Sequence, residues 1–179
     1  MTAWHNAVVC KLFKLKFNSS IIKIIQSFLS ARSFRVYVGS KYSSFYQITA
    51  GCLQGSCLSP ILYNLFTSDV PIFDLRETSI FADDTAILCS DFLANGILHN
   101  LQQDLNKIHQ YLTKWKIALN VHNTQAIYFT RKRKICFTSQ SNIKFNHTNM
   151  PWESKVKYLG IILDRKLTFR DHIQYITSK

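Results

Sequence analysis

Apolar side chains recur at three- and four-residue spacing in two segments of the chain, which predicts two amphipathic helices. The first covers residues 21–29, and the polar residues 18–20 can cap its start. The second covers residues 93–115, with Asp91 as the candidate cap. Its apolar stripe is wide enough to cover one face of a sheet, so we expect this helix to supply core positions and no chemistry.

Two further helices are predicted from their boundary residues. Ser59 can cap a helix, and Pro60 suits its first position because that position needs no backbone donor. This helix is expected to run through Phe66 and to end before Pro71. The apolar and aromatic positions of residues 173–176 indicate a last helix near the end of the sequence.

Two regions are predicted to form hairpins, and in the first of them the apolar pattern changes from helical spacing to a period of two residues. Residues 34–38 and 42–48 are rich in strand-forming side chains and flank a turn at Gly39. Residues 79–82 and 85–89 are apolar and flank an aspartate pair, a gap that suits a two-residue turn with both carboxylates at its tip.

More strand candidates follow the long helix, and the order of elements indicates the fold class. Helices and hairpins interleave without a regular βαβ alternation, so we expect an α+β fold in which an antiparallel sheet packs on helices. The length suits one domain over residues 1–179. The additional strand candidates are residues 126–129, 135–137, 143–145 and 158–163.

Charge narrows the range of partners. The chain has 22 lysine and arginine residues against 10 aspartate and glutamate residues, a net charge of +12, which favours a nucleic acid or an anionic surface and excludes a strongly basic partner. No apolar stretch approaches the roughly 20 residues of a membrane span, so no membrane is expected as a partner. Five cysteines without a C-x-x-C pair indicate a reducing compartment, and no signal-peptide pattern is visible, so we expect an intracellular protein.

The aspartate pair Asp83 and Asp84 is the first candidate for chemistry. Two adjacent carboxylates on a tight turn repel each other unless cations neutralise them. Mg²⁺ prefers such oxygen ligands, and two bound ions can stabilise the attacking and leaving oxygens of a phosphoryl transfer. The plainer alternative is that the pair only forms the turn, because aspartate is a favoured turn residue.

Two other segments could bind a nucleotide or a phosphate. In the loop Gln54, Gly55 and Ser56, a glycine allows close approach of the backbone and a glutamine can both donate and accept hydrogen bonds, although a plain helix-entry loop would look similar. A basic run could contact phosphates, or it could be a solvated turn. Its residues are Arg131, Lys132, Arg133 and Lys134.

Phe81-Ala82-Asp83-Asp84 resembles the F-A-D-D motif of reverse transcriptases from non-LTR retrotransposons of the jockey-like group. Other segments resemble further blocks of that family in the same order, and together they cover nearly the whole chain. These segments are residues 2–5, 27–36, 50–60, 115–129 and 157–172.

The resemblance implies a partial polymerase palm with a piece of the fingers and the start of the thumb. It implies RNA-templated DNA synthesis, in which a primer 3′ hydroxyl attacks the α-phosphate of a deoxynucleoside triphosphate. Asp83 and Asp84 would hold Mg²⁺, or Mn²⁺ in its place, while Gln54 and Gly55 would line the nucleotide and template. A hairpin would position the primer through Tyr158, Leu159 and Gly160. The expected locations are the nucleus and the cytoplasm.

The sequence departs from the family pattern at three points. Leu53 stands at a usual proline, and Asn123 stands at a usual lysine that could protonate the leaving pyrophosphate. The first metal-binding aspartate of the family falls before Met1, so we expect an incomplete site that needs the upstream part of the polymerase. Four other aspartates are expected at helix ends or in connections and offer no replacement ligand: Asp69, Asp74, Asp91 and Asp104.

Two alternatives to an active polymerase follow from these observations. One is a catalytically dead retrotransposon remnant, which the three departures favour. The other is a basic RNA-binding module without polymerase ancestry, which the charge of +12 alone would support. The aspartate pair discriminates between polymerase ancestry and such a module, because RNA binding needs no paired carboxylates.

Overall fold

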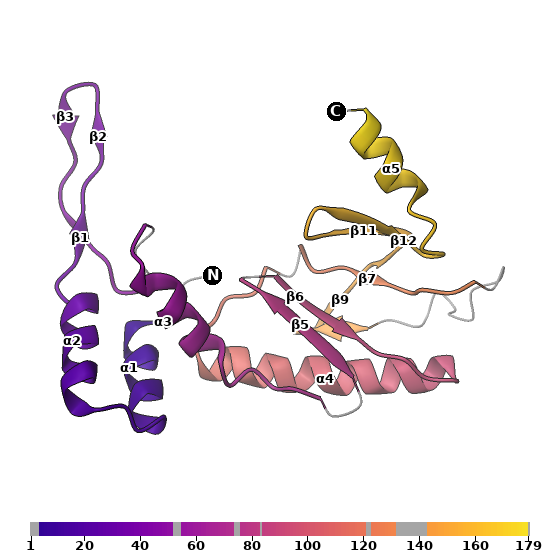
Figure 1. The fold of residues 1–179 in the computed structure, drawn as a ribbon, viewed down its shortest axis with the longest axis horizontal. Coiled ribbons are helices and arrows are strands. Elements are labelled where there is room, and N and C mark those ends of the chain that lie inside the picture. The colour runs from indigo at the N-terminus through magenta and orange to yellow at the C-terminus, as the bar shows by residue number, and fades with distance from the viewer. Residues whose placement is uncertain are drawn as a thin grey trace. The chain divides into compact units, whose positions relative to one another are not determined.

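The computed structural model describes residues 4–51, 55–73, 76–82, 84–120, 123–131 and 143–178. The chain divides into two compact units (Figure 1). The first consists of Met1–Pro71 with Tyr111–Leu119, and the second consists of Ile72–Gln110 with Asn120–Lys179.

Three helices build the core of the first unit: α1 (His5–Lys14), α2 (Ser19–Leu29) and α3 (Leu58–Thr67). The prediction for α2 is confirmed, and its cap is Asn18, whose side chain accepts a hydrogen bond from the Ser20 amide at 2.8 Å. Helix α1 was not predicted. It contacts both other helices through one buried face, and the apolar core residues of the three helices are Ala7, Val8, Leu12, Ile22, Leu29, Leu62 and Phe66.

The start of α3 differs from the prediction. Ser59 does not cap the helix, because α3 begins one residue earlier and buries Ser59 in its first turn. The N-cap residue is Cys57, whose side chain makes no capping hydrogen bond, and the Ser56 hydroxyl just before it accepts from the Leu58 amide at 3.3 Å. Pro60 is tolerated as the third helical residue because the amides of the first turn have no partner inside the helix. The helix ends before Pro71, as predicted.

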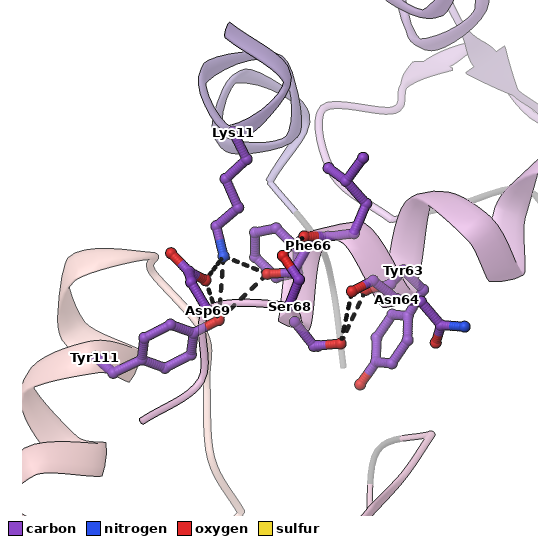
Figure 2. Close-up of polar contacts among 9 residues, drawn as sticks. Lys11, Tyr63, Asn64, Phe66, Ser68, Asp69 and Tyr111 are labelled. Carbon is purple, nitrogen blue, oxygen red and sulfur yellow. Dashed lines mark hydrogen bonds and ion pairs between the residues drawn. The ribbon is translucent and has the colours of Figure 1, made fainter. Parts of the chain in front are cut away.

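Lys11 joins α1 to two other parts of the first unit. Its side chain is buried, and its ammonium group donates to the Phe66 carbonyl oxygen, to the Asp69 carboxylate and, at 3.1 Å, to the Tyr111 hydroxyl (Figure 2). The same group lies 4.2 Å from the centroid of the Trp115 ring. Desolvation lowers the pKa of Lys11 below its ordinary value, although the hydrogen bond and the charge of Asp69 oppose this.

A long hairpin follows α2, as predicted. It consists of β1 (Ser33–Phe34) paired with β4 (Tyr46–Gln47) and, further out, β2 (Tyr37–Val38) paired with β3 (Lys41–Tyr42), all antiparallel (Figure 1). Gly39 and Ser40 make the turn with φ values of 51° and 72°. Positive φ at both positions is typical of the turns that match the twist of a hairpin.

The long helix α4 (Ala94–Lys114) is confirmed. The Asp91 carboxylate accepts a hydrogen bond from the Leu93 amide at 3.2 Å, just before the helix begins. Gly96 has no side chain, which leaves room for this carboxylate. The Gln102 side-chain amide donates to the Lys144 carbonyl and accepts from the Lys144 backbone amide, each at 2.8 Å. These two hydrogen bonds hold a short strand against the helix. None of the helices in the described part of the chain is long and apolar enough to span a membrane.

The predicted α+β class is confirmed, and the second unit contains most of its strands. Within the described residues the strands form six two-stranded ladders, five of them antiparallel, rather than one sheet. The single strand predicted for residues 158–163 is wrong, because the chain turns at Leu159 and Gly160 with φ values of 47° and 86°. The strand predicted for residues 135–137 lies outside the described residues.

The elements of the second unit are, besides α4, four strand pairs and a last helix. The predicted last helix is confirmed and starts earlier than expected, and it packs on β12. The pairs are β5 (Glu77–Phe81) with β6 (Asp84–Leu88), β7 (Ala126–Ile127) with β10 (Trp152–Glu153) in parallel, β8 (Lys144–Phe145) with β9 (Thr148–Asn149), and β11 (Lys155–Tyr158) with β12 (Ile161–Asp164); the helix is α5 (Arg170–Thr177).

Asp104 was expected at a helix end or in a connection, but it lies in the middle of α4. It is fully buried and pairs with the Arg76 guanidinium at 2.6 Å. Its second carboxylate oxygen has no hydrogen-bond partner among the described residues. Burial raises the pKa of Asp104, and the charges of Arg76 and Lys107 only partly oppose this.

Replacing Asp104 by asparagine is expected to change the pH dependence of the free energy of unfolding. A carboxyl group whose folded-state pKa lies above its unfolded value of 3.8 stabilises the fold fully below pH 3.8, and this contribution is lost as the pH rises through the folded-state pKa. The wild type should therefore lose stability relative to Asp104→Asn as the pH rises above 3.8. Urea unfolding at a series of pH values measures this, and a pH-independent difference would contradict it.

Candidate active site

The β5–β6 hairpin carries the predicted aspartate motif, and its register differs by one residue from the prediction. The last ladder pair joins Phe81 to Asp84, so Asp84 is the first residue of β6 and does not lie in the turn. Positions 82 and 83 separate the strands. Ala82 has a φ of 50°, in the left-handed region favoured in such turns, and Asp83 lies outside the described residues.

One face of this hairpin presents the Asp84 carboxylate to solvent. Residues directly opposite each other in an antiparallel pair share a face, and so do residues two apart on a strand. Asp84 therefore shares a face with Phe81 and Ser79. Asp84 is exposed, and 63% of the Phe81 surface is exposed as well. Within the described residues the Asp84 carboxylate makes no ion pair or hydrogen bond, so its oxygens are available to a ligand.

A second hairpin meets the face that carries Asp84. The hydroxyl of Tyr158, the last residue of β11, donates to the Ser79 hydroxyl at 3.2 Å. Ser79 lies two residues before Phe81, which places this contact roughly 7 Å along the strand from the Phe81–Asp84 pair. The structure thus brings the predicted primer-positioning residues Tyr158, Leu159 and Gly160 to the aspartate hairpin. Sequence reasoning missed Ser79, whose only signal is its position two residues before the motif.

The predicted nucleotide loop is described in part and belongs to the first unit. Gly55 has a φ of 84°, a conformation that favours glycine, and a Cβ atom there would meet no atom within 4 Å. Ser56 is half-buried, and Gln54 and Leu53 lie outside the described residues. The prediction that Gln54 and Gly55 lie near the aspartates stays a prediction.

Trp4 and His5 contact the segment that leads into the same loop. The His5 ring nitrogen Nε2 lies 2.8 Å from the Gly51 carbonyl oxygen, and Trp4 pairs with Ala50 in an antiparallel bridge. Two segments that resemble separate blocks of the polymerase family are therefore in contact within the first unit.

Two other predicted features are described incompletely. Arg131 is exposed, whereas Lys132, Arg133 and Lys134 lie outside the described residues. Asn123 is exposed, and its backbone amide donates to the Asn120 carbonyl at 3.1 Å.

The donor chemistry of the hairpin fits a hard divalent cation. Asp84 offers carboxylate oxygens that are exposed and have no partner among the described residues, and Mg²⁺ prefers such oxygen ligands. No group of three histidine, cysteine, aspartate or glutamate residues that could hold a metal ion occurs in the described part of the chain, to which Asp83 does not belong. Among the described residues of the hairpin, Asp84 is thus a suitable ligand, and the other predicted ligand, Asp83, precedes it in the sequence.

Comparison with known proteins gives consistent matches along the chain. The family model for reverse transcriptase (RNA-dependent DNA polymerase) matches residues 1–163. The RNA-directed DNA polymerase from mobile element jockey of Drosophila melanogaster is 33% identical over 181 residues, which cover 97% of this chain and 19% of that protein. The corresponding jockey protein of Drosophila funebris is 32% identical over 95% of this chain and 19% of its own length.

A third relative belongs to another element. The probable RNA-directed DNA polymerase from transposon BS of Drosophila melanogaster is 33% identical, over 98% of this chain and 20% of that protein. The chain thus spans about a fifth of the length of these curated relatives. The predicted resemblance to polymerases of jockey-like elements is confirmed, and the family model covers the aspartate hairpin, so the chain belongs to the reverse transcriptase (RNA-dependent DNA polymerase) family.

Proposed function

We propose that this chain is the palm portion of a retrotransposon reverse transcriptase, with part of the fingers and the start of the thumb, over residues 1–179. The whole polymerase would add deoxynucleotides to a primer 3′ end on an RNA template. The observation that carries this proposal is the β5–β6 hairpin, which presents at its end an Asp84 carboxylate without a partner among the described residues, in a chain of the reverse transcriptase family.

The aspartate pair would hold the metal ions. Asp83 and Asp84 would bind Mg²⁺, or Mn²⁺ in its place, through carboxylate oxygens. When bound, the metal supplies charge stabilisation to the reacting phosphate. The exposure of Asp84 supports this role, because a triphosphate and a primer end must both approach it from solvent.

The remaining site residues would position the nucleic acid and the nucleotide. The contact between Tyr158 and Ser79 supports a primer-positioning role for residues 158–160, because it fixes their hairpin to the face that bears Asp84. The open backbone at Gly55 suits close approach of a nucleotide, with Gln54 and Ser56 beside it. Residues 131–134 would contact phosphates.

The partners follow from the same reasoning. RNA template, DNA primer and deoxynucleoside triphosphates are all polyanions, and the net charge of +12 favours their binding. The proposed locations are the nucleus and the cytoplasm, where RNA templates and DNA primers occur.

A non-catalytic remnant that still binds nucleic acid is the second candidate, and Asn123 favours it. An amide side chain does not titrate, so Asn123 cannot protonate a leaving pyrophosphate as a lysine could. This candidate predicts nucleic-acid binding without DNA synthesis.

Primer extension on an RNA template tests the proposal. A chain extended upstream through the first catalytic block is expected to extend a primer with Mg²⁺, to stop when a chelator removes the metal, and to resume when Mg²⁺ or Mn²⁺ is restored. The 179-residue chain alone is expected to extend none, because two adjacent carboxylates supply too few ligands for two ions. Binding without extension by the longer chain would support the remnant, and extension that persists in chelator would contradict the metal role.

A further inference from the structure

The hairpin arm, residues 33–47, exposes every one of its side chains. All four of its strands, β1 to β4, are exposed on both faces. A hairpin without a covered face is marginally stable in water, and exposed apolar patches mark binding sites. Five of the exposed side chains are aromatic: Phe34, Tyr37, Tyr42, Phe45 and Tyr46.

Four rings of the arm form two cross-strand pairs, and an arginine lies over two of the five rings. Tyr37 and Tyr42 lie opposite each other with ring centroids 4.6 Å apart, and Phe34 and Tyr46 form a second cross-strand pair at 5.8 Å. The Arg35 guanidinium lies 3.8 Å from the Tyr42 centroid and 5.2 Å from that of Phe45. The arm therefore presents flat π-surfaces whose side chains are already held in place by one another.

The charged side chains of the arm and of the sequence around it are all basic. No aspartate or glutamate precedes Asp69 in the sequence, and the arm itself carries Arg35 and Lys41. Basic groups placed among aromatic rings match single-stranded nucleic acid, whose phosphates need cations and whose unpaired bases need stacking partners. A duplex offers phosphates but keeps its bases stacked inside, so the rings would remain unused.

We propose that the hairpin arm binds single-stranded nucleic acid, with bases stacking on the tyrosine and phenylalanine rings and phosphates contacting Arg35 and Lys41. The proposal goes beyond the active site and rests only on the nucleic-acid partner of the proposed function. It requires no catalysis by this chain. Single-stranded RNA and single-stranded DNA share the chemistry that the arm recognises.

Fluorescence anisotropy with the full chain tests the proposal, using a labelled, unstructured RNA, the DNA of the same sequence and a duplex RNA. The double variant Tyr37→Ser with Tyr42→Ser is expected to bind the single-stranded RNA about 5- to 100-fold more weakly, because stacking of one or two bases is lost. The slope of log affinity against log salt should stay the same, because no charge changes. Arg35→Gln should instead reduce the slope by about 0.7, the contribution of one phosphate contact to a single strand.

Two control variants separate stacking from folding. Tyr37→Phe with Tyr42→Phe keeps both rings and should keep the affinity. Val38→Thr changes the other face of the same strand and should also keep it. If the serine variant fails to fold, photocrosslinking of the wild type with a thiouridine-containing RNA decides, because the crosslinks must fall within residues 33–47.

Several outcomes would overturn the proposal. They are equal loss of duplex and single-strand binding in the serine variant, crosslinks confined to other segments, or unchanged affinity in that variant. If the serine variant no longer pellets with phosphatidylserine vesicles but still binds RNA, the arm would be assigned to a membrane surface instead.

Greater affinity of the wild type for the RNA than for the DNA would identify RNA as the ligand. Failure of primer extension with arm-dependent binding intact would reject only the polymerase activity.

Discussion

Replacing Asp84 by asparagine in a chain extended through the upstream catalytic block is expected to reduce primer extension by about a thousandfold. Asparagine keeps the size of the side chain and the strand position but removes the charge that holds a metal ion. A bound metal contributes several kcal/mol to stabilising charge at the reacting phosphate, and about 4 kcal/mol corresponds to a thousandfold in rate. Asp83→Asn is expected to have an effect of the same order.

The matched control is Glu77→Gln, which removes an identical charge from the same hairpin. Glu77 is exposed and pairs with Leu88 at the opposite end of the ladder from Asp84. This variant should extend primers at the wild-type rate. Both variants should bind primer-template as the wild type does, because binding depends on the basic surface. Extension by Asp84→Asn at even a tenth of the wild-type rate would show that Asp84 is not a metal ligand.

Lys11→Ala is expected to lower the free energy of unfolding by about 2–4 kcal/mol. Lys11 is only 2% exposed, and removal of its side chain leaves a void among Phe66, Tyr111 and Trp115 together with the loss of three hydrogen bonds. The carboxylate of Asp69 is about half exposed and remains solvated, which keeps the cost below that of a fully buried ion pair. Urea unfolding of the variant and the wild type measures the difference.

Lys11→Met separates the packing of the stem from the charge. Methionine fills most of the same space, and the Tyr111 hydroxyl already lies 3.2 Å from the Phe66 carbonyl and 3.1 Å from the Asp69 carboxylate, so these groups keep partners. We therefore expect a loss below about 1 kcal/mol. Lys23→Ala, an exposed lysine on α2, should change little. Equal losses in Lys11→Ala and Lys11→Met would attribute the stability to the charge rather than to packing.

Features set by neighbouring residues could be predicted from the sequence. The cap at Asn18, the stripe of α4 and the turn at Gly39 each depend on side chains within a few positions, and all three are confirmed. The family motif is also local, because Phe81 to Asp84 are consecutive residues. The hairpin that bears it could therefore be predicted.

The register of that hairpin could not be predicted, because two-residue turns at 82–83 and at 83–84 are equally compatible with the flanking apolar residues. The ladder starts at the Phe81–Asp84 pair, and this moves Asp84 from the turn onto a strand face. A one-residue shift reverses the face of every side chain on the strand. The tertiary structure therefore decided which way the carboxylate points and that it shares a face with Ser79.

The family, the α+β class, the basic charge and most helices can be derived without the folded chain, because each depends on composition or on residues close together in the sequence. The burial of Asp104 and Lys11 and the contact between Tyr158 and Ser79 arise only when the chain is folded. These contacts join residues 28, 58 and 79 positions apart, and no local periodicity encodes such a pairing. Burial of a charged side chain depends on a partner supplied by another segment, so it can be recognised only when both segments are in place.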